Sequence, residues 1–230
     1  MSENMRVTVE ILFNVAYLIV VWGLVIAMIR NTGAVASEDR VVAQRAKWAF
    51  ALLALGDTGH VGFRVIAYAL GGLEAQPLLV GLGALATAIT ITFFYMLMVD
   101  IWRLRFNKSL GWFGWLLLAV GMIRLAVMAF AQNQWDHIVA PYEWSLLRNA
   151  LLTIQGLGVL YLILRDAIKA RDKAFIWIGV MIALSFAFYA PVILWAAQVP
   201  LLGMLMIPKT CAYVGIAILA YRKLYMLSST

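Results

Sequence analysis

Residues 78–102 read LLVGLGALATAITITFFYMLMVDIW, and Asp100 is the single charged residue in this stretch. A helix of about 20 mostly apolar residues spans the ~30 Å hydrocarbon core of a bilayer, so the stretch predicts a membrane-spanning helix. Six further stretches have the same character, and together the seven cover residues 9–29, 46–70, 78–102, 110–130, 144–167, 174–197 and 201–221. The predicted fold class is all-α, an integral membrane bundle of seven transmembrane helices.

The composition agrees with lipid as the solvent. The 230 residues are 65% hydrophobic and 13% charged, whereas a soluble domain carries about 25% charged residues. Seven spans with short connections use almost the whole length, so we expect one seven-helix transmembrane domain over residues 1–230.

The basic residues predict the topology. Thirteen of the 18 Lys and Arg lie at alternate helix ends, whereas the opposite connections carry Glu74, Asp136 and Glu143 and no Lys or Arg. By the positive-inside rule, the N-terminus is outside and the C-terminus cytoplasmic. The net charge of +7 therefore reflects topology and not nucleic-acid binding. We expect the plasma membrane or a bacterial inner membrane as the location.

The second predicted helix carries the strongest candidate site. Asp57, His60 and Arg64 are spaced i, i+3 and i+7, so they share one helix face. Ionisable residues inside a membrane are costly, near +2.5–3.5 kcal/mol each at the helix centre on insertion scales. This face predicts either a ligand-binding or proton-handling surface, or an internal Asp57–Arg64 network that fixes packing. Glycines at 56, 59 and 62 predict close approach of a neighbouring helix.

The last predicted helix carries Pro208, Lys209 and Tyr213. Lys209 lies about 13 Å inside the outer end, at 1.5 Å per residue from residue 201. It is predicted either to face a binding site or to extend outward to the interface. Pro208 is expected to kink the helix and to free a backbone carbonyl for Lys209 or a ligand.

Other polar residues fall at a similar depth, so the sequence predicts one cationic cavity in the outer half of the bundle. Its excess positive charge favours a small anionic or amphipathic ligand. The predicted ligand-binding residues are Asp57, His60, Arg64, Arg124, Arg148, Gln155, Tyr189, Lys209, Tyr213, Glu10 and Asn14. A binding or sensing protein is the first functional hypothesis, and it requires a separate protein partner or a homo-oligomer to relay a signal.

Three alternatives remain open. In a proton-coupled transporter or ion pump, Asp57, His60 and Lys209 could relay protons. The seven-helix plan with a lysine on the last helix also resembles microbial rhodopsins, which implies retinal on Lys209. The sequence departs from that family because residues 78–102 lack a carboxylate at mid-depth and Pro208 precedes Lys209. A structural subunit of a membrane complex would use the buried charges to hold its helices together.

An enzyme is disfavoured. Catalytic zinc needs three protein ligands, and the chain has two His and one Cys. His137 falls in a predicted outer loop, away from His60 in depth, so no metal site, catalytic residue or cofactor is assigned. Asp100 is expected to form an ion pair at the cytoplasmic rim with Arg103.

Overall fold

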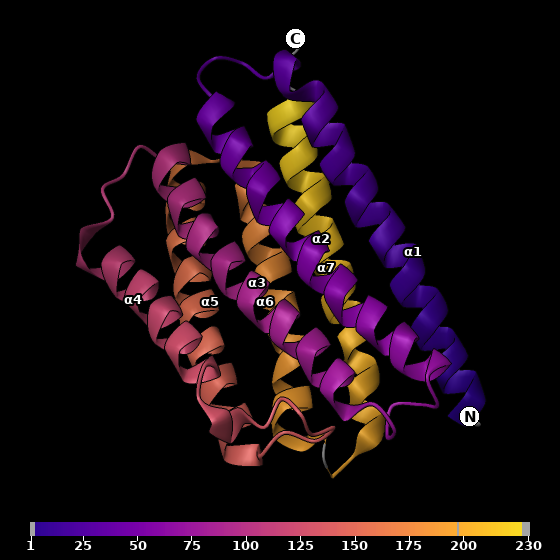
Figure 1. The fold of residues 1–230 in the computed structure, drawn as a ribbon. Helices are drawn as coiled ribbons and strands as arrows, with labels where there is room; N and C mark the ends of the chain where they lie inside the picture. Colours follow the sequence, from indigo (N-terminus) through magenta and orange to yellow (C-terminus); the bar gives the residue numbers. More distant parts are fainter. Residues whose placement is uncertain (1–2, 197, 227–230) are drawn as a thin grey trace.

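The computed structural model describes residues 3–196 and 198–226, with the backbone alone at residues 3–8, 10 and 200. Within these residues, seven helices are long and apolar enough to cross a membrane, which confirms the predicted fold class (Figure 1). Their α-helices are α1 Glu3–Arg30, α2 Arg40–Ala69, α3 Pro77–Arg105, α4 Gly111–Met128, α5 Tyr142–Ala170, α6 Lys173–Trp195 and α7 Met206–Tyr221. The last span, Leu201–Met226, also includes the short helical turns on both sides of α7.

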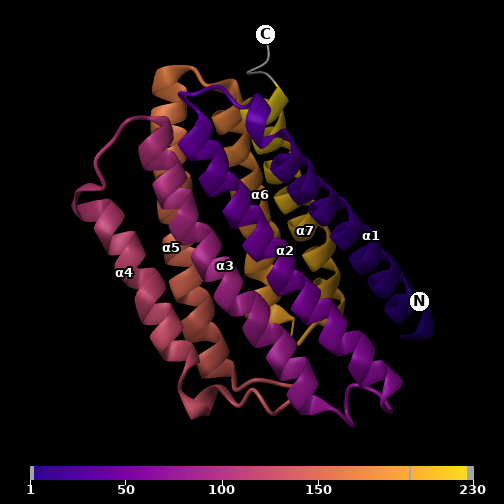
Figure 2. The same ribbon diagram turned by 45° about the horizontal axis from the view of Figure 1, so that its top comes forward.

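The helices form a closed ring. Each helix packs against the next one along the chain, and α7 returns to contact α1, while α3 also reaches α5. Figures 1 and 2 show this arrangement from two directions, with the chain termini at opposite ends of the bundle. Short connections require antiparallel neighbours, so polar residues on alternate helices can meet around a shared interior.

Local sequence explains where several helices begin and end. Gly71 and Gly72 follow α2 with φ of 110° and 106°, a conformation that glycine adopts without a Cβ clash. Pro77 occupies the first turn of α3, where its missing N–H costs nothing. The carboxylate of Asp172 accepts a hydrogen bond from the N–H of Phe175 and caps α6, because this oxygen satisfies an otherwise unpaired helix donor.

The start of α7 differs from the prediction. Residues Pro200–Leu205 form a 3-10 helix, and the α-helix begins only at Met206. Pro208 therefore lies in the first turn of α7 and not in its interior. An N–H in the first turn has no intrahelical acceptor, so proline breaks no helical hydrogen bond there. The reason given for a kink, a proline in the interior of the α-helix, therefore does not hold, and the kink and the freed carbonyl stay predictions.

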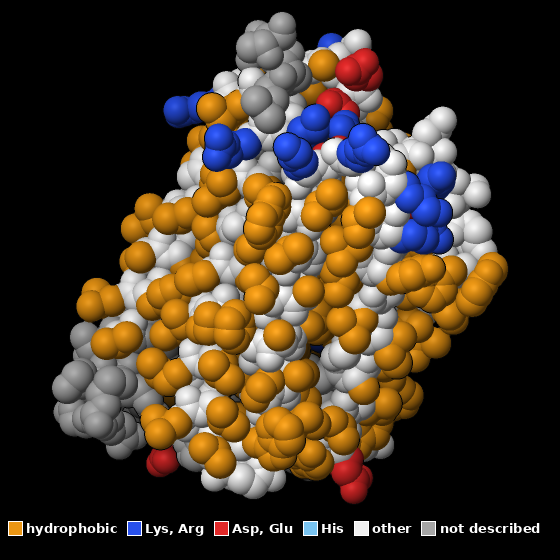
Figure 3. All heavy atoms as spheres, turned by 180° about the vertical axis from the view of Figure 1, so that it is seen from behind, with side chains coloured by type: hydrophobic (Ala, Val, Ile, Leu, Met, Phe, Trp, Pro, Cys, Tyr) orange, Lys and Arg blue, Asp and Glu red, His pale blue; other side chains and the backbone are white. Residues whose placement is uncertain are grey.

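Basic side chains gather toward one end of the bundle, above a broad hydrophobic surface (Figure 3). Arg105 at the end of α3 joins two connections there, because it lies 2.6 Å from Asp39 and 2.7 Å from Asp172. The predicted rim pair is confirmed, since Asp100 lies 2.7 Å from Arg103 and 2.8 Å from Arg45. This basic end is thus held by ion pairs that link several helix ends.

The interior on the basic side of the ring is densely packed. The indole N–H of Trp102 donates to Asp166 at 2.9 Å, and the hydroxyl of Tyr225 donates to the carbonyl of Ala43 at 2.6 Å. Nearer the middle, the ring of Phe94 packs edge-on against Tyr95 and Tyr213, with centroid distances of 5.3 Å and 5.7 Å. These aromatic rings close the interior between the basic end and the cavity that is described next.

A cationic cavity as the candidate functional site

A cavity of about 620 Å³ lies at the end of the bundle opposite the basic side chains. This volume is within the ~300–1,000 Å³ range of small-molecule sites. Its walls come from all seven helices and from the connections that carry Trp135 and Gly203. Tyr213 lies at its inner limit, beside the aromatic cluster. The cavity therefore lies toward one end of the bundle, while packed side chains fill the other.

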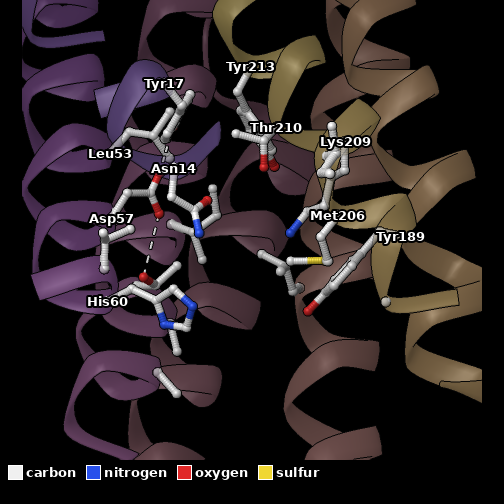
Figure 4. A pocket seen from close by; sticks show the side chains of 18 of the residues that line it. Asn14, Tyr17, Leu53, Asp57, His60, Tyr189, Met206, Lys209, Thr210 and Tyr213 are labelled. Carbon is white, nitrogen blue, oxygen red and sulfur yellow. Dashed lines mark hydrogen bonds between the residues drawn. The ribbon is translucent and has the colours of Figure 1, made fainter. Parts of the chain in front are cut away.

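The predicted face of α2 lines the cavity: Asp57, His60 and Arg64 all contribute to its wall. Asp57 accepts a hydrogen bond from the hydroxyl of Tyr17 on α1 at 2.5 Å, and Thr87 of α3 lies 3.5 Å from its other oxygen. Figure 4 shows Tyr17, Asp57 and His60 on one side of the hollow. Asp57 is thus held mainly by the neutral hydroxyl of Tyr17, since the hydroxyl of Thr87 makes its shorter bond, 3.1 Å, to the carbonyl of Gly56.

Glycines allow α2 and α3 to approach closely at this level. A Cβ at Gly56 would overlap the side chain of Thr90, and one at Gly59 would lie 3.1 Å from the Cβ of Ala86. Gly62, by contrast, has open space where a Cβ would be. The predicted close approach is confirmed at positions 56 and 59. It brings His60 against α3, where a Cβ at Gly83 would lie 3.1 Å from the Cα of His60.

Arg124 is the most deeply buried cation of the cavity, with 2% of its surface exposed. Its guanidinium donates to the carbonyls of Arg148 at 2.8 Å and Ala88 at 2.6 Å, and it also contacts the hydroxyl of Thr92. These partners are dipoles without net charge. They occupy three of the five N–H donors of the guanidinium but leave its positive charge uncompensated, which is costly in a low-dielectric interior.

Arg148 lies next to Arg124 and is also held by neutral groups. It donates to the side-chain oxygen of Asn133 at 2.9 Å, and its guanidinium lies 4.4 Å from the centre of the Trp135 ring. Asn133 and Trp135 belong to the α4–α5 connection, which folds over this end of the cavity. The connection therefore positions Arg148 through an amide and a cation–π contact.

Lys209 faces the cavity. Its ammonium group lies 3.8 Å from the centre of the Tyr189 ring, and the Tyr189 hydroxyl donates to Asn149 at 2.8 Å. In Figure 4, the nitrogen of Lys209 points into the space that separates it from Asp57 and His60. In this conformation Lys209 does not extend outward to the membrane interface, which was the alternative prediction. Lys209 and Asp57 thus face each other across the hollow.

The predicted site residues differ in where the structure places them. Nine of them line the cavity: Asn14, Asp57, His60, Arg64, Arg124, Arg148, Tyr189, Lys209 and Tyr213. Gln155 is not among the lining residues and is buried beside Gly121, between α4 and α5. The side chain of Glu10 lies outside the described residues.

Several lining residues were missing from the predicted set, among them Tyr17, Thr87 and Trp135. Tyr17 follows Asn14 by three residues, so its helical spacing places it on the Asn14 face of α1 although it was left out of the predicted set. Thr87 and Trp135 carry no such signal. Thr87 is one of several threonines in α3, and Trp135 lies in a connection whose path depends on tertiary packing.

The charge of the cavity wall is strongly unequal. Four cationic side chains line it, from Arg64, Arg124, Arg148 and Lys209. Among the described side chains of the wall, Asp57 is the single carboxylate. No group of three or more His, Cys, Asp or Glu that could hold a metal occurs in the part of the chain that the structure describes. The arrangement suits an anion better than a cation.

His137 lies outside this site. Its ring pairs with the neighbouring Asp136 at 3.0 Å in the exposed α4–α5 connection. The hydrogen bond from His137 lowers the pKa of the Asp136 carboxyl.

No family model, curated protein or solved structure matches the chain.

Proposed function

We propose that the protein binds, or senses, a small anionic or amphipathic ligand in the cavity. The observation that carries this proposal is the pair of buried arginines with neutral partners. Arg124 is held by two carbonyls and a hydroxyl, and Arg148 by an amide oxygen and an indole ring. A ligand anion would supply the missing negative charge, and guanidinium groups bind carboxylate and phosphate oxygens well.

The remaining walls support an amphipathic ligand. Tyr17, Tyr189 and Tyr213 present rings with polar tips, and Leu53 and Ile91 add apolar surface. Ligand sites commonly combine such apolar walls with a few fixed polar groups. Asp57 and Lys209 stand on opposite sides of the hollow (Figure 4), so they would orient a ligand that has a donor at one end and an anionic group at the other.

The test is anion affinity in neutral detergent, measured by calorimetry with a panel of short carboxylates and phosphate monoesters. Lys209→Ala and Arg64→Ala should each weaken binding about tenfold or more, since a hydrogen bond to a charged group contributes about 1.5–3 kcal/mol. Lys169→Ala is the matched control, because it removes the same charge from an exposed position at the basic end. Insertion and helix content should be unchanged in all three.

Two outcomes would refute the proposal. One is that no anion of the panel binds to the native protein. The other is that Lys209→Ala and Arg64→Ala leave the affinity unchanged relative to Lys169→Ala. If anions bind and are also moved across proteoliposomes, the same cavity serves a transporter, and flux would then depend on Lys209 in the way that affinity does.

A covalent ligand is a second candidate, and the inward position of Lys209 favours it. Its amine lies against Tyr189 inside the cavity, where an aldehyde such as retinal could condense with it to an imine and release water. Intact mass and peptide mapping of the purified protein test this candidate. An adduct on Lys209 and a visible absorption band that Lys209→Ala abolishes would support it, whereas an absorption band unchanged by Lys209→Ala would refute it.

A further inference from the structure

A second hollow lies on the outer surface of the ring between α5 and α6, with a volume of about 600 Å³. Its lining is Leu146, Asn149, Ala150, Thr153, Ile154, Leu157, Leu160, Ala183, Phe186, Ala187, Ala190, Ile193 and Leu194. We call this hollow the α5–α6 groove. The alanines on both helices lack bulk, and the larger residues around them form its sides.

The groove is apolar along nearly its whole length. Among its lining residues, only Asn149 and Thr153 have polar side chains. The hydroxyl of Thr153 is already bonded to the carbonyl of Asn149 at 2.8 Å, within its own helix. From Leu146 to Leu160 the groove follows about 21 Å of helix, at 1.5 Å per residue. One leaflet of hydrocarbon is about 15 Å thick, so the groove is long enough for one acyl chain.

Asn149 joins the groove to the cationic cavity, because it lines both. Its side chain accepts the hydrogen bond from Tyr189 at 2.8 Å and lies 3.4 Å from the hydroxyl of Ser145. The ring of Tyr189 in turn makes the cation–π contact with the ammonium group of Lys209. The contact between Asn149 and Tyr189 thus stands at the boundary between the lipid-facing groove and the charged interior.

We propose that the ligand is a long-chain fatty carboxylate that enters sideways from the bilayer between α5 and α6. Its carboxylate lies in the cavity near Lys209 and Arg148, and its acyl chain lies in the α5–α6 groove. This inference rests on the proposed anion site and names its ligand class. The orientation fits the bilayer, because Asn149 is near the start of α5, on the cavity side of the bundle, and the groove runs from there toward the middle of the membrane.

The carboxylate and the acyl chain of the ligand contribute differently to the free energy of binding. Moving an acyl chain from lipid into the groove exchanges one apolar environment for another, so it adds little hydrophobic free energy. The groove therefore fixes where the chain lies, while the cationic wall provides the affinity. For this reason the location of a bound chain is a sharper observation than the affinity alone.

The experiment uses palmitate with a photoreactive diazirine at mid-chain, added to the full chain in phosphatidylcholine nanodiscs. Illumination should place adducts on the α5 and α6 peptides that line the groove, and unlabelled palmitate should remove them. Ala187→Trp fills the groove and should reduce this labelling to the background level. Ala119→Trp, a matched change at an exposed position on α4, should leave the labelling unchanged.

A short anion separates this inference from the proposed function. Butyrate has the same headgroup without a chain that reaches the groove, so Ala187→Trp should leave its affinity unchanged. Adducts spread over the lipid-facing helices, or adducts that persist in Ala187→Trp, would overturn the inference. If butyrate affinity still depends on Lys209 in that case, the anion site stands without the groove. If neither butyrate nor palmitate binds, the anion site itself is refuted.

Discussion

Replacing Gln155 by leucine should stabilise the protein. Gln155 is fully buried in α5, at 0% exposure, and neither its amide nitrogen nor its amide oxygen has a hydrogen-bond partner among the described residues. An unsatisfied buried polar group costs about 1–3 kcal/mol. Gln155→Leu removes both polar groups and replaces them with an apolar side chain of similar size. In the unfolded chain in detergent, the amide of Gln155 finds hydrogen-bond partners. The cost of the unsatisfied amide therefore falls on the folded state only.

We expect the free energy of unfolding to rise by about 2 kcal/mol, at the lower end of the sum of two such groups. For a chain of this length, that corresponds to roughly 4–8 °C in melting temperature. The assay is reversible unfolding in mixed micelles by titration with dodecyl sulfate, followed by far-UV circular dichroism. Short-carboxylate affinity should be unchanged, because Gln155 does not line the cavity.

Asn149→Leu is the matched control on the same helix. The amide of Asn149 is hydrogen-bonded to Tyr189 at 2.8 Å, so its loss should lower the free energy of unfolding by about 1 kcal/mol. The reasoning fails if Gln155→Leu destabilises the protein as Asn149→Leu does. It also fails if Gln155→Leu weakens carboxylate binding, since Gln155 would then act in the ligand site.

Two further predictions concern helix packing. Arg105→Met should lower the free energy of unfolding by about 3–5 kcal/mol, because it leaves the largely buried carboxylates of Asp39 and Asp172 without their shared partner. A loss under 1 kcal/mol in the same dodecyl sulfate titration would contradict this. Gly56→Ala should lower stability by about 1–3 kcal/mol, because its Cβ has no room against α3. Gly62→Ala, where space is open, should not destabilise, and equal losses at both positions would show that α2 and α3 are packed less closely.

The fold could be predicted from the sequence because its cause is local. Each span has too few charges for water and enough apolar length for lipid, and no knowledge of the neighbouring helices is needed. The face of α2 was equally local, since helical spacing alone places Asp57 with His60 and Arg64. The ion pair of Asp100 with Arg103 followed from the depth of both residues along their helix.

Side-chain partners could not be predicted in the same way. The hydrogen bond from Tyr17 to Asp57 depends on how α1 and α2 are rotated about their axes. The cation–π contact of Lys209 with the ring of Tyr189 depends on how α6 packs against α7. Gln155 shows the limit most clearly. Its position on α5 suggested a site residue. The orientation of α5 instead places its side chain in the contact between α4 and α5, beside Gly121.

The one-sided cavity has an electrical consequence. An anion bound at Arg124 lies part of the way through the membrane thickness, and the packed basic half separates it from the other side. A full crossing corresponds to about 2.3 kcal/mol per elementary charge for each 100 mV, so each quarter of the thickness contributes about 0.6 kcal/mol. Occupancy of the cavity by a charged ligand would therefore shift with the membrane potential, and the protein would couple voltage to binding without moving a helix.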